Sequence, residues 1–147
     1  MKDNKVQKEE YVDCGMLIKQ ISDHFQSHYN RLLNNINLTA SQFRFLEYMN
    51  RNGGCVSFKD IERHFQISQP TVSGVMKRLA EKNLIEIEAG GSGRAKYARP
   101  TKKGQMVIDE SGVERGKEEK LLLSALQEDE RKLFHDMLER INQKMSE

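Results

Sequence analysis

The side chains best suited to chemistry in this chain lie within residues 57–103, where small polar and basic residues recur at helical spacing. Two helix starts follow one another there. Ser57 precedes Asp60 by three positions, as in a capping box. Ser68 precedes Pro70, which the first turn of a helix tolerates because no partner awaits its missing N–H. The spacing predicts two short helices joined by a tight turn.

The second of these helices has two distinct faces. Its apolar residues fall within one arc of the 3.6-residue wheel and are predicted to pack inward. They are Val72, Val75, Met76 and Leu79. The remaining residues offer hydrogen-bonding groups for base edges and cations for phosphates. They are Ser68, Gln69, Pro70, Thr71, Ser73, Gly74, Lys77 and Arg78. Two short helices with this outward chemistry indicate a helix-turn-helix that binds DNA.

A basic hairpin is predicted after the second helix. Residues 84–88 alternate apolar and charged side chains, which is typical of a strand. Residues 90–93, Gly-Gly-Ser-Gly, suit a tight turn, and residues 94–99 return as the partner strand. Such a hairpin is a wing, with Arg94 and Lys96 as its candidate DNA contacts. Arg94, at the tip, would enter a minor groove.

The charge distribution agrees with a nucleic-acid partner. Residues 57–103 hold ten Lys and Arg against five Asp and Glu, whereas the rest of the chain holds 14 against 17. The basic charge is therefore concentrated where DNA would dock. We find no signal peptide and no apolar run long enough for a membrane span, so we expect a cytoplasmic protein without a membrane partner.

Amphipathic helices are predicted on both sides of this region. Apolar residues recur every three or four positions from about residue 10 to residue 36, and a second capping box, Thr39 with Gln42, starts another helix. After the hairpin, helices are predicted from Thr101 and from Gln127, with a bend in the first of them where Gly112 and Gly116 weaken its middle. The terminal helices carry more apolar surface than one winged helix needs, which predicts a homodimer.

The expected fold is mainly α with a small β-wing, a winged helix-turn-helix flanked by N- and C-terminal dimerisation helices. Residues 55–56 are expected to add a short strand to the wing's sheet. Three parts are predicted: an N-terminal dimerisation helix, the DNA-binding domain and the C-terminal dimerisation helices. They cover residues 1–38, 39–103 and 104–147.

Three segments in this order resemble the MarR family of bacterial transcription regulators. They are LTASQFRFLEYM (38–49), ISQPTVSGVMKRLAEKNLIE (67–86) and GRAKYARPTKKG (93–104). The resemblance covers residues 10–145 in element order. It implies a dimer that binds a pseudo-palindromic operator in double-stranded DNA and represses by blocking polymerase.

The resemblance also implies two ways of releasing DNA. In the family, small aromatic acids or phenols bind between the dimerisation helices and the winged helix, and here Phe25, Tyr29, Phe43 and Phe45 are the candidates. The alternative is that these four are ordinary core residues. In the family's hydroperoxide sensors a cysteine of the first helix is oxidised, and Cys14 occupies that helix. The alternative is an incidental thiol.

Catalytic and metal-binding patterns are weak in this chain. We find no phosphate-binding glycine loop before a helix, no nucleophile elbow and no zinc-protease motif. His24 and His28 are four apart but lack further ligands at suitable spacing, and His64 and His135 stand alone in the sequence. We therefore expect no enzyme activity, no catalytic residue, no metal and no cofactor.

The leading hypothesis is a dimeric, sequence-specific DNA-binding repressor released by a small molecule or by stress. One alternative is a redox-sensing regulator that uses Cys14. Another is a winged helix that binds RNA or protein without operator specificity, because a fold does not determine a function.

Overall fold

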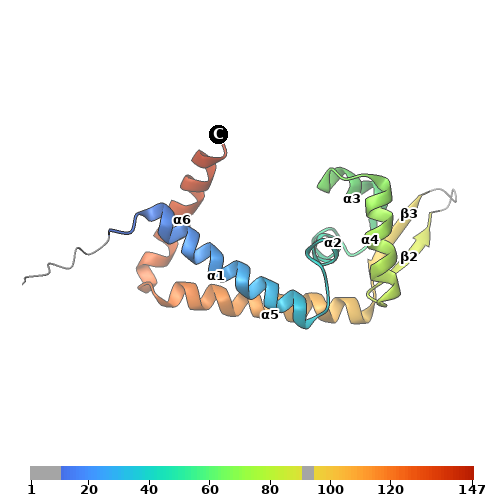
Figure 1. Ribbon diagram of the computed structural model, residues 1–147, viewed down its shortest axis with the longest axis horizontal. Coiled ribbons are helices and arrows are strands. Elements are labelled where there is room, and N and C mark those ends of the chain that lie inside the picture. Colours follow the sequence, from blue (N-terminus) through green and yellow to red (C-terminus); the bar gives the residue numbers. More distant parts are fainter. Residues whose placement is uncertain (1–10, 91–94) are drawn as a thin grey trace, which may run out of the picture. The chain divides into compact units, whose positions relative to one another are not determined.

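The computed structural model describes residues 11–90 and 95–147, and it divides into two compact units, Met1–Leu38 and Thr39–Glu147 (Figure 1). The described part of the first unit is one helix, α1 (Cys14–Asn35). It begins later than the sequence suggested because Asp13 caps it, its carboxylate accepting the Met16 N–H at 2.8 Å. It ends before Asn37, whose φ of 53° is left-handed.

The second unit contains the other helices and a small sheet. Its elements are α2 (Ala40–Arg51), β1 (Val56–Ser57), α3 (Phe58–Phe65), α4 (Gln69–Glu81), β2 (Ile85–Ala89), β3 (Lys96–Pro100), α5 (Lys102–Ser124) and α6 (Glu128–Met145). The predicted helix-turn-helix corresponds to α3 and α4 and is confirmed. Helix α5 is continuous through Gly112 and Gly116, and the bend predicted there stays a prediction.

Side-chain caps define the helix starts in the second unit. Thr39 and Gln42 form the predicted capping box at α2, with hydrogen bonds in both directions at 3.2 Å. Ser57 accepts the Asp60 N–H at the start of α3, and Ser68 caps α4. These caps satisfy N–H groups that would otherwise lack partners. Each helix therefore begins close to the residue that the sequence indicated.

The sheet has the strand order β1-β3-β2, with antiparallel pairs throughout. The short strand predicted at residues 55–56 is confirmed with a shift of one residue. Ala98 in the central strand pairs with Val56 on one side and Ile87 on the other. The hairpin β2–β3 lies beside α4 (Figure 1). Predictions for residues 91–94, the wing tip with Arg94, lie outside the described residues.

The core of the second unit lies between α2, α3, α4 and the sheet. Its fully buried side chains include Phe43, Leu46, Met49, Ile61, Val72, Met76 and Leu79. The predicted inward face of α4 is thus confirmed, except that Val75 is only half-buried. α5 packs on α2, where Arg115 pairs with Glu47 at 2.5 Å.

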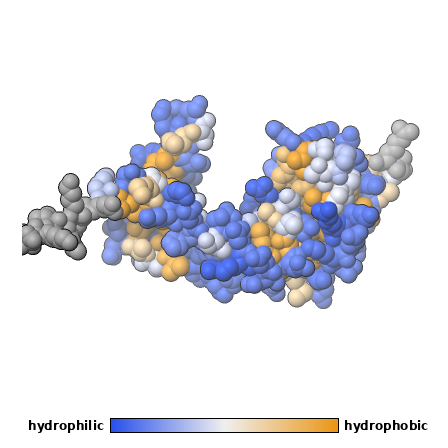
Figure 2. Space-filling model, viewed as in Figure 1, coloured by the Kyte–Doolittle hydropathy of each residue, from blue (hydrophilic) through white to orange (hydrophobic). Residues whose placement is uncertain are grey.

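The terminal helices expose large apolar side chains. No residue of α6 is buried, and apolar side chains are visible at its surface (Figure 2). Those of α1 are Met16, Leu17, Ile18 and Ile21, and those of α6 are Leu133, Met137, Leu138, Ile141 and Met145. Among the described residues no helix combines the length and apolarity that a membrane crossing requires.

Candidate nucleic-acid interface

The amino-terminal half of α4 presents a row of polar side chains to solvent. Seven of the eight residues predicted on this face are exposed, and Ser73 is half-buried. The row begins at the Ser68 cap and continues through the first two turns, where a recognition helix contacts base edges. Pro70 lies in the first turn, as predicted.

Two hydrogen-bonded pairs order this polar row. The hydroxyl oxygens of Ser68 and Thr71 lie 2.9 Å apart, and Gln69 Nε2 donates to Ser73 Oγ at 3.0 Å. Both pairs are local to the helix, so they hold the side chains in defined rotamers without burying them. A side chain ordered in this way loses less conformational entropy when it binds a base. The Gln69 amide is the group with the donor and acceptor that adenine requires.

The turn before α4 depends on a residue in a left-handed conformation. Gln66 has φ 52° and ψ 48°, and its N–H closes α3 by donating to Glu62 O. An aromatic cluster supports α3 from the α2 side: Phe65 stacks on Phe45 at 5.2 Å, and His64 lies 4.5 Å from Tyr48 between ring centroids. The sequence indicated a break here but not the role of Gln66.

The wing carries its own cross-strand ion pairs. Arg99 on β3 pairs with Glu86, its register partner on β2, at 3.7 Å and with Glu88 on the same face. All three side chains are about half exposed, so the contribution of these pairs to stability is small. The alternation of charged residues in β2 was visible in the sequence. Only the strand register shows that Arg99 is the residue of β3 that faces them. Lys96 is exposed at the start of β3.

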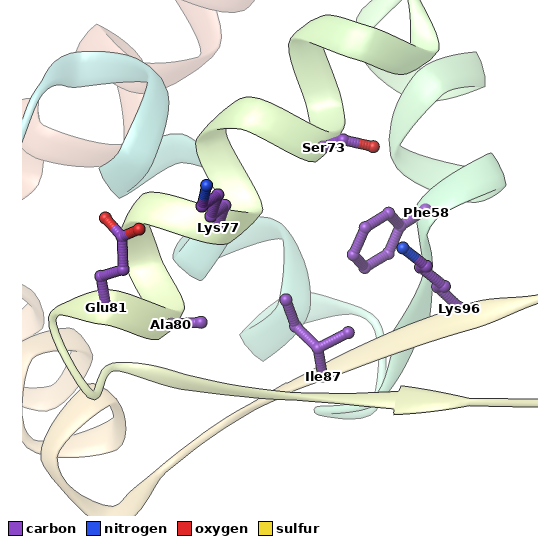
Figure 3. Close-up of a pocket in the computed structure, with 7 residues that line it drawn as sticks. All are labelled: Phe58, Ser73, Lys77, Ala80, Glu81, Ile87 and Lys96. Carbon is purple, nitrogen blue, oxygen red and sulfur yellow. The ribbon is translucent and has the colours of Figure 1, made fainter.

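A groove of about 550 Å³ lies between α4 and the wing (Figure 3). It is lined by Phe58, Ser73, Lys77, Ala80, Glu81, Ile87 and Lys96. Ser73 and Lys77 extend from α4, while Ile87 and Lys96 come from the two wing strands (Figure 3). The fold thus brings predicted residues of the recognition helix and the wing to one concave surface. Phe58, Ala80, Glu81 and Ile87 were missed by sequence analysis, because their proximity depends on how α4 packs on the sheet.

The four residues predicted to line an effector site differ in burial. Phe43 and Phe45 are 0% and 2% exposed and belong to the core of the second unit. Phe25 and Tyr29 are half-buried on α1. Phe43 and Phe45 are therefore core residues, as the alternative interpretation held. That any of the four aromatic residues binds an effector stays a prediction.

The thiols and histidines show one difference from expectation. Cys14 and Cys55 are both exposed. His135, predicted to stand alone, lies with Asp136 and Glu139 in a group whose candidate ligand atoms are within 4.8 Å of one another. The Lys132 ammonium competes for this group. It hydrogen-bonds Asp136 at 2.9 Å and lowers the pKa of that carboxyl, and its own pKa is raised in return.

The fold and this surface define a winged helix-turn-helix protein. Comparison with known proteins shows which family of such proteins the chain resembles. The model of the MarR family matches residues 36–95. The HTH-type transcriptional regulator FarR of Neisseria gonorrhoeae is 24% identical over 104 residues, which are 70% of this chain and 69% of FarR. Over these residues the chain is similar to the MarR family of transcription regulators.

Solved structures show the same architecture. A crystal structure of MarR is 25% identical, with a TM-score of 0.67 and 94% of both chains covered. The MepR–DNA complex of S. aureus is 23% identical, with a TM-score of 0.75, and the match covers 89% of this chain and 98% of MepR. These matches confirm the predicted fold class, and the family model and FarR bear out the predicted resemblance to the MarR family.

Proposed function

We propose that this protein is a sequence-specific, homodimeric DNA-binding regulator that represses transcription until a small molecule or stress signal releases it. The observation that carries the proposal is the exposed polar row on α4 beside a groove that contains both Lys77 and Lys96. The similar MepR chain was crystallised in complex with DNA, which supports a DNA partner for this chain.

The arrangement suits B-DNA for geometric reasons. The first two turns of α4 would enter the major groove, with Gln69 on adenine and with Ser68, Thr71 and Ser73 near base edges or a thymine methyl. Lys77 and Arg78 would bind phosphate or guanine, and Lys96 would bind phosphate beside them. Arg94 would reach the adjacent minor groove. The resulting contacts would combine base-specific and salt-dependent binding.

The exposed apolar residues of α1 and α6 support the dimer. Their exposed fractions range from 39% for Leu138 to 82% for Met145. Large apolar surfaces of this kind mark interaction sites in soluble proteins. A twofold dimer would place two α4 helices about 34 Å apart, one turn of B-DNA, and so explain a pseudo-palindromic operator.

The releasing signal is proposed to be a small aromatic compound. Aromatic side chains suit such a ligand because stacking and apolar burial supply its affinity. Phe25 and Tyr29, half-buried on α1, have surface to offer. Phe43 and Phe45 would take part only if the core around them rearranged, since they are buried.

Replacing Gln69 by Ala tests sequence-specific recognition. We expect affinity for the duplex that the wild-type protein selects from a random-sequence library to fall by about tenfold or more, because a bidentate side-chain–base contact is worth about 1–3 kcal/mol. Affinity for a scrambled duplex should stay the same, because Gln69 carries no charge. Titration of both duplexes by fluorescence anisotropy measures this.

Gln143→Ala, an exposed glutamine on α6, is the matched control and should bind both duplexes like the wild type. If Gln69→Ala binds the selected duplex with wild-type affinity, base recognition by α4 is wrong. If no duplex is selected over others, the alternative of an RNA- or protein-binding winged helix is favoured.

The redox alternative rests on Cys14, which is exposed in the first turn of α1. If Cys14 is the sensor, peroxide should release the wild-type protein from DNA but leave Cys14→Ser bound, because the reactive thiol is then absent. Cys55→Ser controls for the other exposed thiol. If peroxide still releases the Cys14→Ser protein fully from DNA, Cys14 is not the sensor.

A further inference from the structure

One buried side-chain oxygen joins the start of α2 to the end of α4. Gln42 Oε1 accepts the Thr39 N–H at 3.2 Å and also a hydrogen bond from Lys82 Nζ at 3.0 Å. The Gln42 residue is only 3% exposed, and Lys82 is the carboxy-terminal cap residue of α4. A cation at this position also interacts favourably with the negative carboxy-terminal end of the helix dipole. The capping glutamine therefore has a second partner 40 residues away.

The same end of α4 is held from another direction by the start of α5. Thr101 Oγ1 donates to Asn83 O at 2.6 Å, and Lys103 Nζ donates to Lys82 O at 3.2 Å. The Thr101 N–H donates to Leu84 O at 3.0 Å. These bonds satisfy carbonyl groups that follow the last turn of α4. The exit of α4 is thus attached to both α2 and α5 through directional contacts.

The other end of α4 has a different character. There the hydrogen bonds of the Ser68 side chain with Thr71 and of the Gln69 side chain with Ser73 stay within the helix and its cap. Apolar packing of Val72, Met76 and Leu79 decides which face points inward, but such packing is non-directional. The hydrogen-bonded end therefore adds a directional restraint on the angle of the helix to that given by packing.

A small change of angle at that end becomes a large displacement at the base-reading end. The 13 residues of α4 span about 20 Å at 1.5 Å per residue. A tilt of about 5° at Lys82 would move Ser68 by roughly 2 Å over that length. Hydrogen bonds to base edges need donor–acceptor distances of about 2.7–3.2 Å, so such a tilt breaks them.

We propose that Gln42 and Lys82 are positioning residues for DNA recognition, with the Gln42 carbonyl oxygen fixing the angle of α4 through Lys82. This inference rests on the proposed function, because it assigns how the recognition helix is aimed. Neither residue needs to touch DNA.

The decisive variant is Lys82→Met, which keeps the apolar stem and the Thr39–Gln42 capping box but removes the hydrogen bond. We expect its affinity for the duplex selected by the wild-type protein to fall about five- to tenfold, because charge-assisted hydrogen bonds are the strong ones. Lys82→Arg should restore affinity to within about twofold, because it keeps a charged donor.

Salt dependence separates positioning from phosphate binding. A lost phosphate contact lowers the slope of log affinity against log salt by about 0.9, whereas a positioning residue leaves the slope unchanged. Lys102→Met is the matched control: Lys102 is exposed at the start of α5, one residue before the partner of Lys82 O. It removes the same charge from the same end of α4, and we expect less than about a twofold loss of affinity at fixed slope.

A double variant completes the test. If Gln42 and Lys82 act through one contact, Gln42→Met with Lys82→Met should lose no more affinity than Gln42→Met alone. Circular dichroism confirms that each variant is folded at the assay temperature. Wild-type affinity in Lys82→Met, a slope reduced by about 0.9, or additive losses would overturn this inference while leaving the proposed function intact. Failure of the wild-type protein to select any duplex would instead overturn the proposed function itself.

Discussion

Replacing Ile141 by Glu on α6 is expected to convert the proposed dimer to monomers and to abolish operator binding at nanomolar protein concentration. Ile141 is 48% exposed in the single chain, within the apolar face that also holds Leu138 and Met145. A twofold interface receives each substitution twice. Burying an unpaired carboxylate costs several kcal/mol, so the dissociation constant of the dimer should rise roughly 1,000-fold or more.

Loss of operator binding follows from loss of the dimer. Two linked half-site contacts gain about 10²–10⁴ in affinity over one, through effective concentration. Sedimentation equilibrium measures the dimer, and anisotropy with the selected duplex measures binding. The control is Gln143→Glu, which adds the same charge about 200° further around the helix at 100° per residue. A dimer unchanged in Ile141→Glu would contradict the assignment of α6 to the interface.

Replacing Gly104 by Ala is expected to destabilise the fold by about 3 kcal/mol or more, because overpacking against backbone is costly. A Cβ at Gly104 would lie 2.0 Å from Leu84 O, a backbone atom that already accepts the Thr101 N–H. Either α5 or the exit of α4 must shift. The melting temperature should fall by about 10 °C for a domain of this size.

The same helix offers a matched control with the opposite sign. Gly112 lies in the interior of α5, is exposed and would place a Cβ with nothing within 4 Å. Gly112→Ala should therefore stabilise the protein by about 0.5–1 kcal/mol, the helix-propensity gain. Thermal unfolding followed by circular dichroism compares the two. Equal effects at both glycines would show that the close approach at Leu84 is not a constraint.

The helix-turn-helix was predictable because its signals are local. Caps such as Ser57 and Ser68, and the apolar spacing of α4, act within one or two turns of a helix. The wing strands were predictable for a similar reason, since alternation and a glycine-rich turn are short-range patterns. Helix α5 continues through Gly112 and Gly116 because a cost of about 1 kcal/mol per glycine is easily outweighed by the rest of the helix.

The contacts that join elements were not predictable from the sequence. Gln42 was identified as a capping residue, but its bond to Lys82 spans 40 positions. Arg99 was seen as a basic wing residue, and only the register of β2 and β3 shows that Glu86 and Glu88 share its face. The groove between α4 and the wing likewise combines Phe58 of α3 and Ile87 of β2 with residues of α4, which are distant in the sequence.

Local sequence therefore determined which residues form helices and strands, which side of α4 is polar, and which family the chain resembles. Tertiary structure decided what holds α4 at its end, why Gly104 tolerates no side chain, and which predicted residues share one groove. The physical reason is the distance along the chain over which each kind of interaction acts. Capping and periodicity act between neighbours in the chain, whereas aim and shape depend on hydrogen bonds and packing between segments that only folding brings together.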